Sequence, residues 1–129
     1  MQASGTFEVT LTPQAPSAGI EPAQFGRQTI VKQFHGDLEA TSLGEMLAAM
    51  SPVPGSAGYV AMERVDGTLH GCRGSFVLQH SGTMTRGTSA LSVSVVPDSG
   101  TGELAGLRGT MSIEIVQRRH SYRFDYLLE

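Results

Sequence analysis

The chain has 129 residues, enough for one domain and too few for two independently packed cores. Hydrophobic residues make up 40% and charged residues 16%, with a net charge of -3, which excludes a disordered chain and a basic nucleic-acid groove. The single cysteine excludes an internal disulfide framework, and no apolar run approaches the ~20 residues of a membrane-spanning helix. We expect one soluble, cytoplasmic domain over residues 1–129 that binds neither nucleic acid nor membrane.

Apolar residues alternate with polar ones along most of the chain, the pattern of strands with one buried face. The first strand is predicted over 6–12. Residues 13–24 follow as a Pro-rich loop, and both a lid and a surface strap remain open for it. A second strand is predicted over 28–34, and Gly36-Asp37 provides a turn into a third strand.

The segment 43–50 leaves two interpretations open. Its leucines and methionines lie at helical spacing, so a short helix competes with a continued third strand. After the Pro/Gly break at 51–56, Asp66-Gly67 is the strongest hairpin signal and Ser81-Gly82 a weaker one, because these pairs tolerate positive φ. The remaining strands are predicted over 59–65, 68–80, 83–96, 107–116 and 122–128.

About eight strands in meander order, with short connections and no helix long enough to cover an open sheet, indicate an all-β fold. A closed barrel and a sandwich both fit this order. We expect a single closed antiparallel β-barrel, because closure removes the exposed strand edges.

Two-residue hairpin turns fix which residues face each other. A turn at Asp66-Gly67 places Glu63 opposite His70, and arginines and serines then gather on the outer face. The predicted inward face consists of Tyr59, Glu63, Val65, His70, Cys72, Phe76, Leu78, His80, Thr85, Ser89, Leu91, Val93 and Val95.

A carboxylate on this apolar face is costly unless it is paired, so Glu63 is expected to find a donor or to hold a proton. A cross-strand pair of Glu63 and His70 suits general acid and base catalysis. In the alternative interpretation, the two side chains only satisfy each other near the hairpin end.

Three segments, 58–65, 74–82 and 100–109, closely resemble the DUF3224 family of bacterial proteins, and 32–39 and 122–126 extend the resemblance over nearly the whole chain. The resemblance implies an eight-stranded antiparallel barrel similar to allene oxide cyclase, of calycin-like type, and implies no assigned activity. The family pattern includes positions that match Glu39, Glu63, Phe76, Gln79 and His80.

Two functions remain open. In the first, the lumen binds a small apolar molecule, with or without cofactor-independent isomerase or cyclase activity; in the second, a filled barrel serves a structural or protein-interaction role. We expect no cofactor and no metal site, since the histidine spacings match no ligand pattern, and we leave self-association open. The catalytic candidates are Glu63, His70 and His80. The ligand-binding candidates are Tyr59, Cys72, Phe76, Leu78, Thr85, Ser89, Tyr126 and Glu39.

Overall fold

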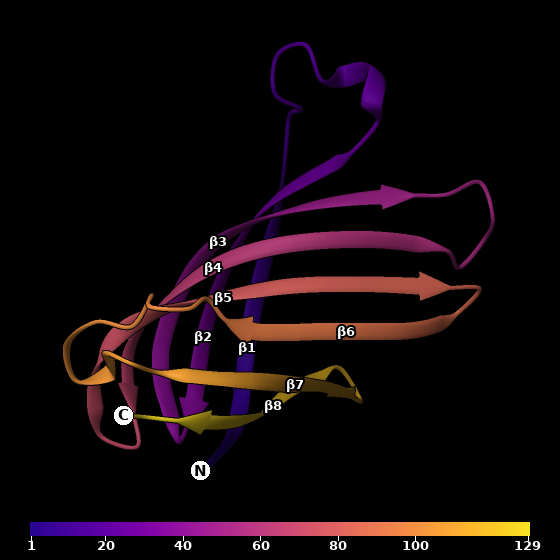
Figure 1. The fold of residues 1–129 in the computed structure, drawn as a ribbon. Helices are drawn as coiled ribbons and strands as arrows, with labels where there is room; N and C mark the ends of the chain where they lie inside the picture. Colours follow the sequence, from indigo (N-terminus) through magenta and orange to yellow (C-terminus); the bar gives the residue numbers. More distant parts are fainter.

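The computed structural model describes residues 1–129 as eight antiparallel strands that close into a barrel in chain order (Figure 1). The predicted all-β barrel is therefore confirmed. The strands are β1 (Gln2–Gln14), β2 (Gly26–Gly36), β3 (Leu38–Met50), β4 (Ala57–Leu69), β5 (Cys72–Thr85), β6 (Thr88–Val95), β7 (Arg108–Val116) and β8 (Arg119–Leu127). Two short 3-10 helices, η1 (Glu21–Ala23) and η2 (Gly102–Leu104), lie in the longer connections, and neither is long or apolar enough to cross a membrane.

The segment 43–50 is strand, because β3 pairs with β2 on one side and β4 on the other along this stretch. Its helical spacing arises because both faces of the strand carry apolar side chains. Met46 points inward and is partly buried, whereas Leu43 and Leu47 point outward and are exposed.

The predicted turn at Asp66-Gly67 is wrong. Both residues lie inside β4, and the β4–β5 turn is His70-Gly71, with φ angles of 47° and 80° as a type I′ turn requires. Gly67 serves a different purpose, since a Cβ there would lie 2.2 Å from the Glu39 carbonyl oxygen of β3. Glu63 consequently faces Leu78 across the ladder, and the predicted Glu63–His70 pair does not exist.

The predicted turn at Ser81-Gly82 is wrong for a similar reason. The β5–β6 turn is Arg86-Gly87, and Gly82 makes room for the Tyr59 ring, which a Cβ would approach to 2.4 Å.

The two turns lie later in the chain than predicted, so the partner of Glu63 moves from His70 to Leu78 and that of Leu78 from Thr85 to Val95, an even number of residues in both hairpins. The predicted inward residues of β4, β5 and β6 therefore point inward, although their cross-strand partners differ. Thr85 is the exception: it was predicted to point inward on the strand after the turn, but it lies at the end of β5, next to the inward Met84, and points outward.

The end of the barrel that carries the β2–β3 and β4–β5 turns, here called the narrow end, is packed with aromatic side chains. Phe34, Phe76 and Phe124 are at most 1% exposed, and the Phe76 and Phe124 rings stack at 5.9 Å. The segment around η2 adds the buried Leu104 and Leu107 to this core. The narrow half of the lumen is thus filled.

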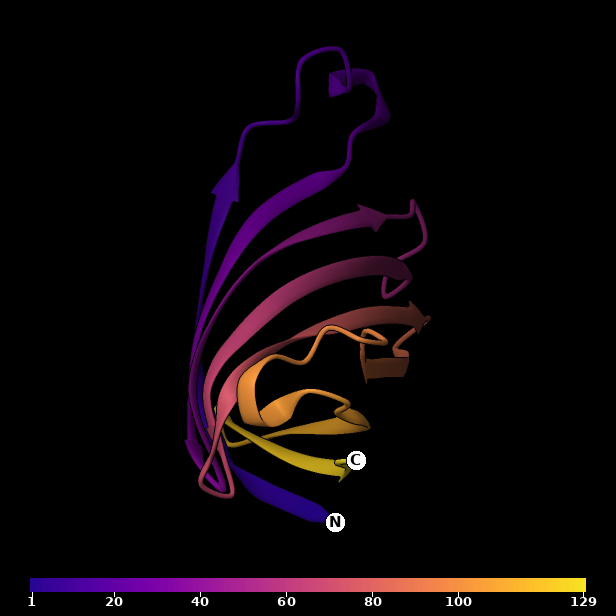
Figure 2. The same ribbon diagram turned by 60° about the vertical axis from the view of Figure 1, so that its left-hand side comes forward.

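At the opposite end, here called the wide end, the strands separate. β6 and β7 pair only at Ser94 and Thr110, and the two strands diverge from there toward the β5–β6 turn (Figure 1). Figure 2 shows the long curved strands β3–β6 from another side, with the β1–β2 loop far from β7 and β8. The barrel is closed around its narrow half and spread open at its wide end.

Tyr122 ties β8 to the β2–β3 turn. Its hydroxyl donates to the His35 carbonyl at 3.0 Å and accepts from the Leu38 N–H at 2.9 Å. We expect Tyr122→Phe to lower the free energy of unfolding by about 1–3 kcal/mol, because the buried Leu38 N–H loses its partner. Urea unfolding measures this loss, and an unchanged midpoint would show that the turn satisfies the N–H in another way.

Candidate functional site

A network of four side chains lies inside the barrel, between the packed core and the wide end. Glu63 accepts hydrogen bonds from Lys32 Nζ at 2.8 Å and His80 Nε2 at 2.5 Å on Oε2, and from Ser42 Oγ at 2.9 Å on Oε1. The Glu63 side chain is 0% exposed, and those of Lys32 and His80 are 7% and 5% exposed. We call these four residues the charge network.

The strand register explains how the network assembles. Lys32 and Ser42 are direct partners across β2 and β3, and both point inward. Glu63 on β4 faces Gly44, where a Cβ would lie 2.8 Å from the Glu63 Cβ, so the absence of a side chain gives Glu63 its space. Lys32 Nζ also lies 4.8 Å from the centre of the Phe7 ring, which adds a cation–π contact.

The network keeps Glu63 ionised. Burial by itself raises the pKa of Glu63, but the hydrogen bond from His80 and the charge and hydrogen bond of Lys32 outweigh it and lower the pKa to about 2. Burial, followed by the nearby Glu63 charge, raises the pKa of the Tyr59 hydroxyl. At neutral pH the site therefore contains a carboxylate with three donors and an un-ionised phenol.

A pocket of about 520 Å³ opens beside the network on the inner face of the wide end. We call it the inner pocket. It adjoins the network through Tyr59, whose ring centre is 6.4 Å from that of His80. Its lining is mainly apolar and comes from β3 to β7, reaching across the gap between β6 and β7. The inward-pointing residues are Met46, Ala48, Ala57, Tyr59, Gly82, Met84, Ser89, Leu91, Ile113 and Ile115.

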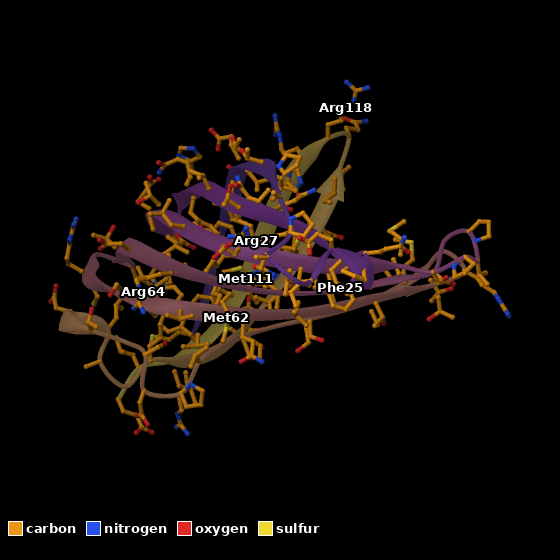
Figure 3. All side chains as sticks on the ribbon, turned by 90° about the horizontal axis from the view of Figure 1, so that it is seen from above. Phe25, Arg27, Met62, Arg64, Met111 and Arg118 are labelled. Carbon is orange, nitrogen blue, oxygen red and sulfur yellow. The ribbon has the colours of Figure 1, made fainter.

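A second depression of about 430 Å³, here called the outer groove, lies on the opposite face of the same strands. Arg27 pairs with Glu45 there at 2.9 Å, and Ser17 of the β1–β2 loop contributes to the rim. Figure 3 looks toward this outer face and labels Arg27 and Met62 on it. Ser17 is the residue of the 13–24 loop that lines the outer groove, and the lining of the inner pocket includes no residue of this loop.

The predicted site residues separate into groups. Glu63 and His80 meet in the charge network, and Tyr59 and Ser89 line the inner pocket. His70 lies in the β4–β5 turn at the narrow end, where its Nδ1 contacts the Tyr126 hydroxyl and its Nε2 is 3.6 Å from Asp37. The structure therefore separates His70 from the other catalytic candidates.

The remaining candidates are distributed over the core and the surface. Phe76 and Leu78 are packed in the core, and Cys72 is partly buried against it. Glu39 is exposed and accepts from the Gly36 N–H, while Thr85 is exposed beside the β5–β6 turn. No cluster of three or more histidine, cysteine, aspartate or glutamate side chains is arranged to hold a metal ion.

The sequence reasoning missed Lys32 and Ser42. Lys32 carried a signal, because it is the only lysine of the chain and shares a strand face with Ile30 and Phe34, both strongly apolar. A cation at such an inward position requires a buried anion, and Glu63 was the inward carboxylate available. Ser42 carried no comparable signal, since it lies in the part of β3 where the strand pattern is weak.

The fold and the site define a class of protein: a small antiparallel barrel with one packed half, a buried ion network and an open apolar end. The chain matches the model of the family described as "Protein of unknown function (DUF3224)" over residues 3–126, and it belongs to that family. It is similar to a solved structure of a DUF3224 protein of unknown function from Shewanella oneidensis MR-1, with 51% identity and a TM-score of 0.93. The match covers 100% of this chain and 97% of the other. No curated protein matches the sequence.

Proposed function

We propose that this barrel binds a small apolar molecule in the inner pocket. The observation that carries the proposal is the set of inward-facing apolar side chains that nothing covers at the wide end. Met84, Leu91 and Ile115 point toward the lumen, yet they are 43%, 45% and 64% exposed. Large apolar side chains that converge on a concave surface favour an apolar occupant.

The size and position of the pocket support the same proposal. A volume of about 520 Å³ lies within the range of ~300–1,000 Å³ that is typical of small-molecule sites. The pocket lies where β6 and β7 are unpaired, since its lining includes Leu91 of β6 and Ile115 of β7 while only Ser94 and Thr110 pair. The filled narrow half agrees with the alternative of a structural barrel, but that alternative does not account for the uncovered apolar wall of the wide half.

The proposal stops at binding and does not extend to isomerase or cyclase activity. Glu63 is the acid or base that such activity would use, with His80 as its partner. Its carboxylate already accepts three hydrogen bonds, and its lowered pKa leaves no proton to donate at neutral pH. A fully paired carboxylate is a poor general acid or base, since proton transfer needs a pKa near the working pH.

Adjacent alanines on β3 provide a matched test. Ala48 points into the inner pocket and Ala49 points to the outer face. We expect Ala48→Phe to weaken binding of aminoanthracene, an uncharged apolar fluorophore, by about tenfold or more, because the added ring occupies the pocket. Ala49→Phe is expected to leave the affinity unchanged. A fluorescence titration of each folded variant measures the difference.

Native mass spectrometry of the freshly purified protein, followed by denaturation and extraction, asks which molecule the pocket carries. An apolar molecule bound at one per chain in the parent protein and in Ala49→Phe, but absent from Ala48→Phe, is the expected result. Equal aminoanthracene affinities for Ala48→Phe and Ala49→Phe would contradict the proposal and leave the structural barrel as the better account.

A further inference from the structure

Strand β6 has one edge without a partner strand. Along its other edge Thr88–Val95 pairs with β5 at every residue, whereas on the free side Ser94 alone pairs, with Thr110 of β7. The stretch before this pair, Thr88–Ser92, is exposed at all of its residues, on both faces of the strand. Figure 1 shows β6 and β7 diverging along this stretch. The backbone N–H and C=O groups of the free edge therefore have no strand partner within the chain.

The other free edges of the barrel carry residues that discourage pairing with a further strand. β1 extends beyond its pairing with β8, and the part that extends contains Glu8 and Pro13. The free part of β7 contains Glu114. Charged side chains and proline at an edge hinder the addition of another strand. β6 contains neither a charged residue nor a proline, so its free edge is open to a partner.

The sequence of this edge suits pairing with a second copy of the same strand. Because β6 carries no charge, two copies of it do not repel each other. A two-fold axis through Leu91 places Leu91 opposite its own copy and Ala90 opposite Ser92 of the second chain, with each pair on the same face of the sheet. Leu91 is 45% exposed in the single chain, and an apolar cross-strand pair reduces its contact with water.

The two ends of β6 carry opposite charges. Arg86 lies in the turn before the strand and Asp98 shortly after it, and both residues are exposed. None of the ion pairs within the chain involves either residue. Antiparallel pairing places the beginning of one β6 beside the end of the other, so Arg86 of each chain approaches Asp98 of the second chain. This charge complementarity favours a second copy over a partner of unrelated sequence.

We propose that two copies of this protein associate through the free edges of β6, which then form one antiparallel ladder centred on Leu91 between the two barrels. Such pairing uses the backbone groups that the single chain leaves unpaired. The contact is short and few large side chains take part in it, so the dimer is weak and dissociates on dilution. The proposal does not depend on ligand binding, because the ladder consists of backbone groups and forms in the empty protein.

Sedimentation velocity at protein concentrations up to the millimolar level tests the proposal. The parent protein is expected to change from monomer to dimer as the concentration rises. Ala90→Lys/Ser92→Lys is expected to raise the dissociation constant at low salt about tenfold or more, because each new lysine faces another across the axis. Thr41→Lys/Leu43→Lys adds the same charge on the exposed outer face of β3, whose edges are both paired there, and is expected to leave the dissociation constant unchanged.

The charge-swapped variant Ala90→Glu/Ser92→Lys tests the register of the ladder. Each new glutamate faces a new lysine of the second chain, so dimerisation is expected to return to the parent level or above it. Amide hydrogen exchange provides a second measurement. Protection of the β6 amides is expected to increase with the concentration of the parent protein, because the ladder forms only in the dimer.

Three results would overturn the proposal. The first is a parent protein that stays monomeric up to the millimolar level. The second is a dimer that Ala90→Lys/Ser92→Lys leaves intact and Thr41→Lys/Leu43→Lys dissociates, since the contact then lies on the outer face of β3. The third is an Ala90→Glu/Ser92→Lys variant that dissociates as readily as Ala90→Lys/Ser92→Lys, which would exclude a ladder centred on Leu91.

Discussion

Replacing Lys32 by methionine is expected to lower the free energy of unfolding by about 3–5 kcal/mol. The substitution keeps the length of the side chain and its contact with the Phe7 ring but removes the charge that neutralises Glu63. Glu63 then remains as a buried carboxylate without its lysine partner or must take up a proton. Either result is costly, because an ion in an apolar interior loses its hydration without an equivalent replacement.

Urea unfolding of Lys32→Met and of the double variant Lys32→Met/Glu63→Gln checks this expectation. The double variant removes both charges and keeps an amide at this position: its oxygen accepts from Ser42 or from His80, and its NH2 group faces the other, whose oxygen or ring nitrogen can accept. We expect it to recover a large part of the lost stability, because paired burial of charges contributes little net stability while an unpaired charge costs much. A loss below about 1 kcal/mol in the single variant, the level of an exposed pair, would show that water reaches Glu63.

Acid is expected to destabilise the barrel through Glu63. Its pKa is about 2 in the folded protein against an ordinary value of 4.5, so the ionised carboxylate contributes stability above pH 4.5. This contribution is lost as the pH falls from 4.5 through 2, because the unfolded chain binds the proton first. The shift corresponds to about 3 kcal/mol, an order-of-magnitude value for a fully buried group.

Unfolding free energies measured between pH 2 and pH 7 in the parent protein and in Glu63→Gln test this dependence. The glutamine variant is expected to lack most of the decrease below pH 4.5, since it has no proton to bind at this position. Glu39→Gln, at an exposed carboxylate, is the matched control and is expected to follow the parent curve. If Glu63→Gln follows the parent curve as well, the acid sensitivity comes from other carboxylates.

The charge network also divides the lumen. Phe34, Phe76 and Phe124 fill the space on one side of it, and Tyr59 begins the open pocket on the other. The polar side chains of the charge network hydrogen-bond to one another. The packed apolar core can therefore end at this level without leaving a buried polar group unpaired. The apolar wall of the wide end lies beyond this polar level, and of its residues Ile113 also packs against the core.

The fold could be predicted from the sequence because its strands and connections follow from patterns of neighbouring residues. Alternation along β1, β2, β4 and β5 identifies strands and their inward faces, and short connections in meander order identify the barrel. Glu63 and His80 were correctly predicted to point inward for the same reason. Side chains alternate between the two faces of a strand, and moving a two-residue turn along the chain changes the cross-strand partners but not this alternation.

The partners of those residues depended on tertiary structure. Gly67 and Gly82 resemble turn glycines in the sequence, yet they are needed where the Glu39 carbonyl and the Tyr59 ring approach the strands. Only the folded chain shows such an approach, because the approaching atoms come from other strands. The assignment of His70 as the partner of Glu63 failed for this reason.

The sequence by itself therefore determined the strands, their faces and the presence of a buried carboxylate, all of which follow from local periodicity. The tertiary structure decided that Lys32 from a strand far along the chain neutralises Glu63 and that β6 separates from β7. These features depend on register, closure and curvature of the whole barrel, which arise from many contacts between distant residues and leave no local pattern.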